Sequence, residues 1–137
     1  MYDLERFERE QKETHATVVA ELKNGRKRSC WMWYTFPQIV GLGDSYMSRK
    51  YAIKSLEEAK AYLDNRLLRD NLYELCNVLL ISDKDAYSIF GRPDCYKLKS
   101  SMTLFDMVSP DDVFERVLEK FYHGERCEET KVIISKI

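Results

Sequence analysis

Glycine and proline are scarce in this sequence, with five glycines and three prolines among 137 residues. This is about half of their usual combined share of roughly 12%, so long elements with few interruptions are expected. These residues gather around Gly25, Pro37 to Gly43, Gly91 to Pro93, Pro110 and Gly124. Between these points apolar residues recur three or four positions apart, which is typical of amphipathic helices. The pattern predicts an all-α fold.

Motifs for metals, cofactors and familiar catalytic chemistry are also lacking. There are two histidines, and the four cysteines contain no C-x-x-C pair, so no metal site is predicted. The sequence has no G-x-G-x-x-G or P-loop, no G-x-S-x-G elbow and no H-E-x-x-H. No cofactor is therefore predicted, and no catalytic residue can be named.

Long apolar runs are absent as well. The longest uncharged run, Ser29 to Gly43, is too short for a membrane span and contains Pro37 and Gly41. The first residues, MYDLERFEREQ, have no apolar signal core. We expect a cytoplasmic protein with reduced thiols and no membrane partner.

A chain of this length fits one domain, here residues 1–137. The apolar spacing predicts helices over about residues 4–22, 55–63, 68–79, 94–108, 110–121 and 128–137. With short additional turns, we expect one compact bundle of about six to eight helices. Its one irregular connection is rich in aromatic residues and lies around Trp31 to Val40, where a strand is the alternative.

Local signals place the helix ends. Asp3 is expected to cap the first helix and Gly25 to end it, and the S-x-x-E box of Ser55 and Glu58 starts the second. Asp94 is expected as the cap of the helix at 94–108. Ser109 is expected as the next cap, with Pro110 at the first helical position. In the last helix, Val132, Ile133 and Ile137 are expected to face inward.

Charge is balanced over the whole chain, at a net −1, but unevenly distributed. Residues 23–54 carry seven basic side chains and one acidic one. Inside this run, RKR is followed by CWMWYTFPQ, with four aromatic residues in nine positions. Cations bind phosphates and aromatic faces stack on bases or sugars. The segment therefore suggests a nucleotide or nucleic-acid site, and its alternative is a charged segment leading into an aromatic core.

Polar residues on expected core faces are further candidates. Gln11 and His15 lie on the inward stripe of the first helix, and Ser100 and Ser101 crowd the helix at 94–108. Each needs a partner, either in the protein or in a ligand. The candidate ligand-binding residues are Gln11, His15, Lys27, Arg28, Trp31, Trp33, Phe36, Gln38, Arg49, Lys97, Ser100 and Ser101.

Three stretches, GRKRSCWMWYTFPQIVGLG, YAIKSLEEAKAYL and IFGRPDCYKLKSSMTLF, together with DLERF, resemble a bacterial domain-of-unknown-function family, number eighteen-ten. Its members are sometimes labelled calpastatin, a disordered inhibitor whose composition differs from this one. The resemblance implies a mainly helical fold and no established activity. Where that family usually has histidine before W-M-W, this chain has Cys30. A looser resemblance, carried by SLEEAKAYL and by Lys97 to Phe121, is to N-glycosidases named for NAD and ADP-ribose.

Two functions are therefore open. One is a site for an anionic small molecule such as a nucleotide or an ADP-ribose derivative, with or without hydrolysis, with Trp31, Trp33 and Phe36 as walls. The other is a non-catalytic module that docks RNA or a protein through the same surface.

Overall fold

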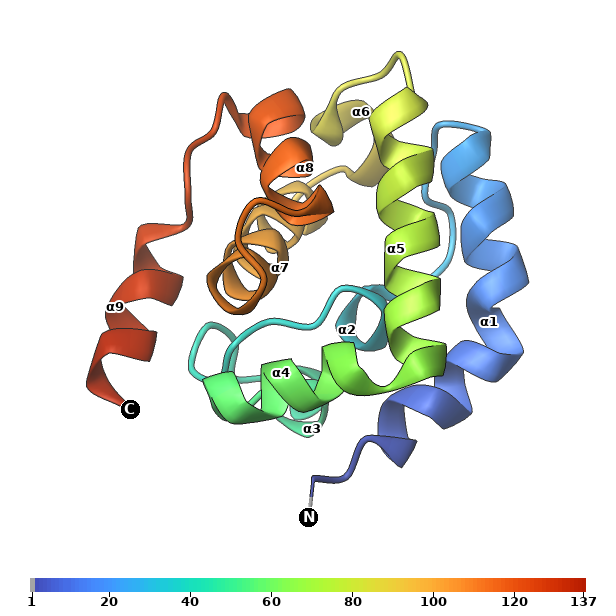
Figure 1. Ribbon diagram of the computed structural model, residues 1–137. Coiled ribbons are helices and arrows are strands. Elements are labelled where there is room, and N and C mark those ends of the chain that lie inside the picture. Colours follow the sequence, from blue (N-terminus) through green and yellow to red (C-terminus); the bar gives the residue numbers. More distant parts are fainter. Residues whose placement is uncertain (1) are drawn as a thin grey trace.

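The computed structural model describes residues 2–137, and this range contains nine helices (Figure 1). The all-α class predicted from the sequence is confirmed. The helices are α1 (Glu5–Lys23), α2 (Met32–Thr35), α3 (Tyr46–Tyr51), α4 (Leu56–Asp64), α5 (Arg66–Ile81), α6 (Ala86–Phe90), α7 (Asp94–Val108), α8 (Val113–Tyr122) and α9 (Glu128–Lys136). Three of the helices, α2, α3 and α6, are too short to show a clear spacing of apolar residues in the sequence. They bring the number to nine, where about six to eight were expected.

Helix α5 is central, with α1 packed on one side of it and α8 on the other, while α7 packs on α8 (Figure 1). A row of aromatic rings links these elements. The ring centroids of Phe7 and Tyr62 are 5.2 Å apart, those of Tyr62 and Phe105 5.2 Å, and those of Phe105 and Phe114 5.6 Å. All four side chains are fully buried, so the row runs through the middle of the core.

The start of α1 is tied to the segment that leads into α4. Arg6 donates from Nε to the Lys50 carbonyl at 2.8 Å and from Nη2 to the Ala52 carbonyl at 2.9 Å. The same Nη2 forms a 2.9 Å ion pair with the buried carboxylate of Glu58, which also accepts from the Lys54 amide. A buried guanidinium and a buried carboxylate are thus both satisfied.

Several predicted helix ends agree with the structure. Gly25 has φ +75° and donates to the Leu22 carbonyl, while the Arg26 amide reaches the Glu21 carbonyl, which is the Schellman ending of α1. Ser55 accepts from the Glu58 amide at 3.0 Å and so starts α4 as expected.

Other predicted caps are wrong. Leu4 holds the cap position of α1, so Asp3 lies one residue too early. Asp112, not Ser109, caps α8 by accepting from the Val113 amide at 2.6 Å. Asp111 has φ +59°, which ends any helical path from Pro110 before α8 begins.

Helices α7 and α9 also differ from their predicted details. The residue before α7 is Pro93, so Asp94 is the first helical residue instead of its cap. In α9 the buried residues are Thr130 and Ile134, whereas Val132 is 48% and Ile137 63% exposed. The helix docks on α7 through this other face, and of the three expected inward residues only Ile133 packs against the core.

The aromatic connection between α1 and α4 is neither a strand nor a long helix. It contains the single turn α2, the short α3 and one isolated parallel bridge between Ile39 and Ile53. The bridge has two 2.8 Å bonds, from the Val40 amide to the Ile53 carbonyl and from the Ile53 amide to the Gln38 carbonyl. Over residues 2–137, no helix combines the length and apolar character that a membrane crossing needs.

Candidate functional site

Two of the expected aromatic walls are core residues. Trp31 and Phe36 are each 1% exposed, and both pack against Phe90 with ring centroids 6.3 and 6.0 Å from it. In this conformation neither ring faces an open site, because other core side chains cover them. Trp33, between them, is half-buried.

A buried carboxylate organises the basic loop after α1. Glu21 Oε1 accepts from the Arg28 amide at 2.7 Å, from the Ser29 amide at 3.1 Å and from the Trp31 indole nitrogen at 2.9 Å. Its Oε2 accepts from the Ser29 hydroxyl. Burial raises the pKa of Glu21, but these hydrogen bonds, led by that of Ser29, outweigh it and lower the pKa to about 2. The charge of Glu21 therefore fixes the backbone of the loop, while Arg28 remains exposed.

The basic run of residues 23–54 is divided between the two ends of α1. The Lys27 amide donates to the Ile89 carbonyl at 2.7 Å, near the end of α1, whereas the Lys50 carbonyl is bound by Arg6 at its start. Arg6 and Glu21 are fifteen positions apart on the helix, which corresponds to about 22 Å at a rise of about 1.5 Å per residue. Arg49, on α3, is therefore separate from Lys27 and Arg28 (Figure 1).

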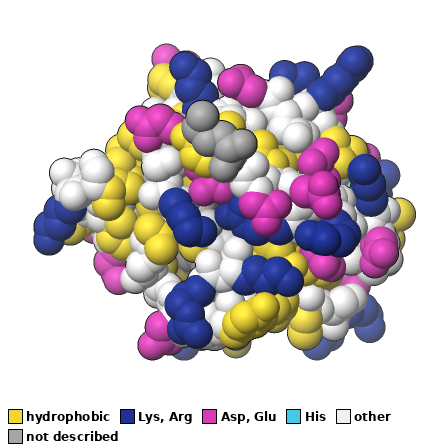
Figure 2. Space-filling model, turned by 90° about the horizontal axis from the view of Figure 1, so that it is seen from below, with side chains coloured by type: hydrophobic (Ala, Val, Ile, Leu, Met, Phe, Trp, Pro, Cys, Tyr) yellow, Lys and Arg dark blue, Asp and Glu magenta, His cyan; other side chains and the backbone are white. Residues whose placement is uncertain are grey.

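The face at the start of α1 has mixed charge. Seen from below, basic and acidic side chains alternate across it (Figure 2). A hollow there is lined by Arg6, Arg9, Lys50 and Lys54 together with the acids Asp3 and Glu58, and Glu58 is paired with Arg6. No broad positive surface results from the cations on this face.

At the other end of α1, the loop and α6 border an open hollow of about 650 Å³ at the surface, which we call the basic hollow. Its lining residues are Asn24, Gly25, Arg26, Lys27, Arg28, Lys84, Tyr87, Ser88, Ile89, Phe90 and Gly91. Four of these are cations, and none of the lining residues within the described chain is an acid. The hollow combines two predicted residues, Lys27 and Arg28, with partners that the sequence did not single out.

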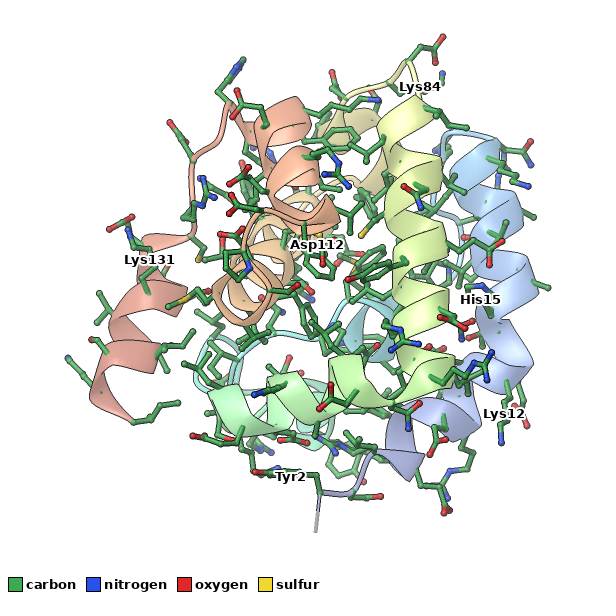
Figure 3. All side chains as sticks on the ribbon, in the orientation of Figure 1. Tyr2, Lys12, His15, Lys84, Asp112 and Lys131 are labelled. Atoms are coloured by element: carbon green, nitrogen blue, oxygen red, sulfur yellow. The ribbon has the colours of Figure 1, made fainter. Side chains whose placement is uncertain are left out.

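One of these partners, Lys84, crosses the backbone at Gly25. A Cβ built on Gly25 would lie 2.7 Å from Lys84 Cε, so a larger residue would push the lysine stem aside, and the φ of +75° favours glycine at this position. Figure 3 shows Lys84 at the end of the molecule where α5 ends, away from Lys12 and Tyr2. The stem thus reaches the basic hollow across the end of α1.

Tyr87 supplies an exposed aromatic face at the basic hollow. It is 62% exposed, and the Arg92 guanidinium carbon lies 5.5 Å from its ring centroid. An exposed ring with a cation over it is suited to stacking on a base or a sugar. This is the role that Trp31 and Phe36 were expected to have.

Behind Lys27, a carboxylate lies between two ammonium groups. Lys27 Nζ is 3.0 Å from Asp94 Oδ2, and Lys97 Nζ is 3.6 Å from Asp94 Oδ1. The two lysines also lie over indole rings, Lys27 at 5.2 Å from the Trp31 centroid and Lys97 at 5.7 Å from that of Trp33. Two predicted site lysines therefore meet at Asp94, each of them beside a predicted tryptophan, whereas the sequence had suggested Asp94 only as a cap.

The polar residues of α1 have protein partners. Gln11 Nε2 donates to the Tyr34 carbonyl at 2.7 Å and to the Tyr62 hydroxyl at 2.9 Å, and Gln11 Oε1 accepts from Asn71. His15 Nε2 is 2.7 Å from Glu74 Oε1, which links α1 to α5 (Figure 3). Neither residue lines the basic hollow.

The remaining candidates lie elsewhere. Ser100 is in a different hollow, where its hydroxyl oxygen lies 3.2 Å from the Tyr96 carbonyl oxygen, to which it donates, and 3.3 Å from Cys127 Sγ. Ser101 is completely buried, and its hydroxyl has no partner within residues 2–137. Gln38 and Trp33 line a small cavity of about 20 Å³, enough for about one water molecule.

Side chains that could ligate a metal are dispersed. Within the part of the chain that is described, no three His, Cys, Asp or Glu side chains gather as a metal ion would require.

The residues that sequence reasoning missed, Lys84, Tyr87 and Arg92, lie on and beside the short helix α6. The available signal was S-D-K-D-A-Y-S, in which Asp85 caps α6 by accepting from the Ser88 amide at 2.7 Å. This cap predicts a helix start, but not that the helix lies against the loop after α1.

No curated protein matches this chain. A solved structure, that of the conserved hypothetical protein Rv1873 from Mycobacterium tuberculosis, is similar along nearly the whole length. It has 41% sequence identity and a TM-score of 0.95, covering 98% of this chain and 97% of that one. The model of the family described as "Protein of unknown function (DUF1810)" matches residues 1–134. The chain therefore belongs to this family, as its sequence motifs had suggested.

Proposed function

We propose that this protein binds an anionic, phosphate-bearing small molecule, such as a nucleotide or an ADP-ribose derivative, in the basic hollow. The observation that carries this proposal is the lining of the hollow, with four cations and, among the described residues, no carboxylate. A volume of about 650 Å³ is within the roughly 300–1,000 Å³ usual for small-molecule sites.

The phosphate and the base or ribose of such a ligand have separate partners in the basic hollow. Arg26, Arg28 and Lys84 are exposed cations, and guanidinium groups bind phosphate in a bidentate manner. The exposed face of Tyr87 can stack on a base or a ribose. Because Glu21 holds the backbone at Arg28 and Ser29, the loop is already ordered before a ligand arrives.

A small ligand is favoured over RNA by the distribution of charge. A single strand needs a positive groove that follows several phosphates. Here Lys50 and Lys54 lie at the opposite end of α1, where the acids Asp3 and Glu58 line the same hollow, and Arg49 precedes Lys50 on α3. The proposal is for binding, because the described lining holds no histidine, cysteine or carboxylate that would move a proton in hydrolysis.

The test is isothermal titration calorimetry with ADP-ribose, AMP, inorganic pyrophosphate and an oligouridylate, at about 50 and 200 mM salt. We expect one phosphate ligand to bind with modest salt dependence. Arg28→Ala and Lys84→Ala should each weaken binding about five- to tenfold, since each removes one charged contact. Arg49→Ala removes the same charge from the same basic run and should leave the affinity unchanged.

Three results would contradict the proposal. One is the absence of binding by every phosphate ligand. Another is binding that Arg49→Ala weakens as much as Arg28→Ala does. The third is binding of the oligouridylate alone with a steep salt dependence, which would indicate an RNA module.

A further inference from the structure

Asp94 is paired with one of the cations that line the basic hollow. Lys27 lines the hollow, yet its Nζ is 3.0 Å from Asp94 Oδ2, and the two side chains are only 12% and 17% exposed. Asp94 does not line the hollow. Before a ligand arrives, therefore, the lysine ammonium is already paired with an anion that belongs to the protein.

From this geometry we infer that Asp94 is an internal competitor for Lys27, so that an anionic ligand binds by taking this lysine from Asp94. The inference rests on the proposed function and names Asp94 as the residue that regulates the affinity of that site. The Lys27 backbone is held by its bond to the Ile89 carbonyl at 2.7 Å, so only the side chain has to move. A lysine is suited to this movement, because its ammonium is a compact charge on a flexible stem.

Lys97 makes the exchange possible. Leaving a half-buried carboxylate without a partner is costly, which would oppose release of Lys27. Lys97 Nζ is already 3.6 Å from the other oxygen of Asp94 and lies three residues further along α7. It can keep Asp94 paired when Lys27 turns to the ligand. Lys97 is therefore a positioning residue that acts through Asp94, because it does not itself line the basic hollow.

The indole under Lys27 reports the movement. Lys27 Nζ lies 5.2 Å from the Trp31 ring centroid, while Lys97 lies over Trp33. A cation near an indole changes its electronic environment, so departure of Lys27 should shift the emission of Trp31. Inorganic pyrophosphate is the probe of choice, because it has no ring that could stack or absorb light.

The experiment compares the affinity for pyrophosphate and ADP-ribose of the wild type, Asp94→Asn, Lys97→Met and the double variant. We expect Asp94→Asn to bind about fivefold more tightly, because a neutral amide holds the Lys27 ammonium less strongly than the carboxylate does. Lys97→Met should bind more weakly, because Asp94 then holds Lys27 alone. In the double variant the effect of Lys97→Met should disappear, since no carboxylate remains to relay it. A purely structural role for Asp94 would give weaker binding instead.

The outcomes separate this inference from the proposed function. If the wild type binds, Arg28→Ala weakens binding and Asp94→Asn leaves it unchanged or weaker, only the role of Asp94 is overturned. If Lys97→Met weakens binding as much in Asp94→Asn as it does in the wild type, Lys97 attracts the ligand directly. Its action through Asp94 is then overturned. If neither the wild type nor Asp94→Asn binds, both proposals fail. Should Asp94→Asn not fold, wild-type tryptophan emission decides, because pyrophosphate binding without a change in emission excludes the movement of Lys27.

Discussion

The indole nitrogen of Trp31 donates a 2.9 Å hydrogen bond to the carboxylate of Glu21, ten residues earlier in the chain. Both side chains are buried, Trp31 at 1% and Glu21 at 8% exposure. The cation-rich loop thus follows Glu21 in the chain, and its far end is bound by the buried carboxylate of the same residue. This contact attaches the cation-rich loop to the core.

Glu21→Gln should destabilise the protein by about 2–3 kcal/mol. A glutamine keeps one oxygen for the Arg28 amide, the Ser29 amide and the Trp31 indole, but it replaces Oε2 by a donor beside the Ser29 hydroxyl and removes the negative charge that strengthens all four bonds. Urea unfolding followed by circular dichroism measures the change. Glu13→Gln is the control, because Glu13 is exposed on the same helix. Equal stability of the two variants would show that Glu21 does not hold the loop.

The same carboxylate should contribute to acid unfolding. Its pKa is lowered in the folded state, from an ordinary 4.5 to about 2, so its contribution is complete above pH 4.5 and is lost as the pH falls toward 2. The loss attributable to this group is at most about 3 kcal/mol. Unfolding free energies measured from pH 7 to pH 2 should therefore fall more steeply in the wild type than in Glu21→Gln. Parallel curves would assign the acid dependence to other carboxylates.

Tyr73→Phe should loosen the contact between α5 and α8. The Tyr73 hydroxyl donates to Asp112, the cap of α8, which also accepts from Ser109 at 2.7 Å (Figure 3). Removal of this donor should cost about 1 kcal/mol of stability at neutral pH. Burial first, and then the bond to Asp112, raise the pKa of Tyr73 to about 12. The contribution of the Tyr73 hydroxyl to the free energy of unfolding is thus present below pH 10 and lost as the pH rises toward 12. In alkali the variant should lose less stability than the wild type, and an equal loss would contradict this assignment.

Thiol reactivity should differ sharply among the cysteines. Cys30 is exposed, while Cys76 is buried beside the Met102 sulfur, 3.8 Å away, and burial raises the pKa of its thiol. Burial also raises the pKa of the Cys95 thiol. With a disulfide reagent such as dithionitrobenzoate, Cys30→Ser should abolish the fastest phase, and Cys76 should react only after unfolding. A fast phase that persists in Cys30→Ser would contradict this order.

The helical framework could be predicted from the sequence because its signals are local. The stripes of α5 and α8 place Leu72 and Phe114 inward, and the structure buries both. The sequence predicts Gly25 as a helix end, because the left-handed backbone conformation that ends many helices favours glycine. In the structure the φ of Gly25 is +75°. Each of these inferences needs only the few residues of one or two helical turns.

The candidate site could be predicted only in part, because it depends on contacts between distant segments. The sequence suggested Lys27, Arg28 and Lys97, but not that Lys84 lies across Gly25 or that Asp94 lies between two lysines. It also grouped Arg49 with Arg28, because both belong to the same basic run. Residues of one run need not be neighbours in space. Trp31 and Phe36 were expected to form walls of the ligand site. Their large apolar side chains are instead buried in the core.

The bonds of Arg6 have a consequence for how this chain can be divided. Its guanidinium is bound by groups 44, 46 and 52 residues further on, namely Lys50, Ala52 and Glu58. A fragment that ends before Glu58 would keep the arginine but lose the charge that balances it, at a cost of about 3–5 kcal/mol. The start of α1 is therefore stabilised by partners about fifty residues further on, which it gains only when the chain between them has closed into a loop. Proteolytic cuts in the intervening loop should thus release unfolded pieces instead of a smaller stable core.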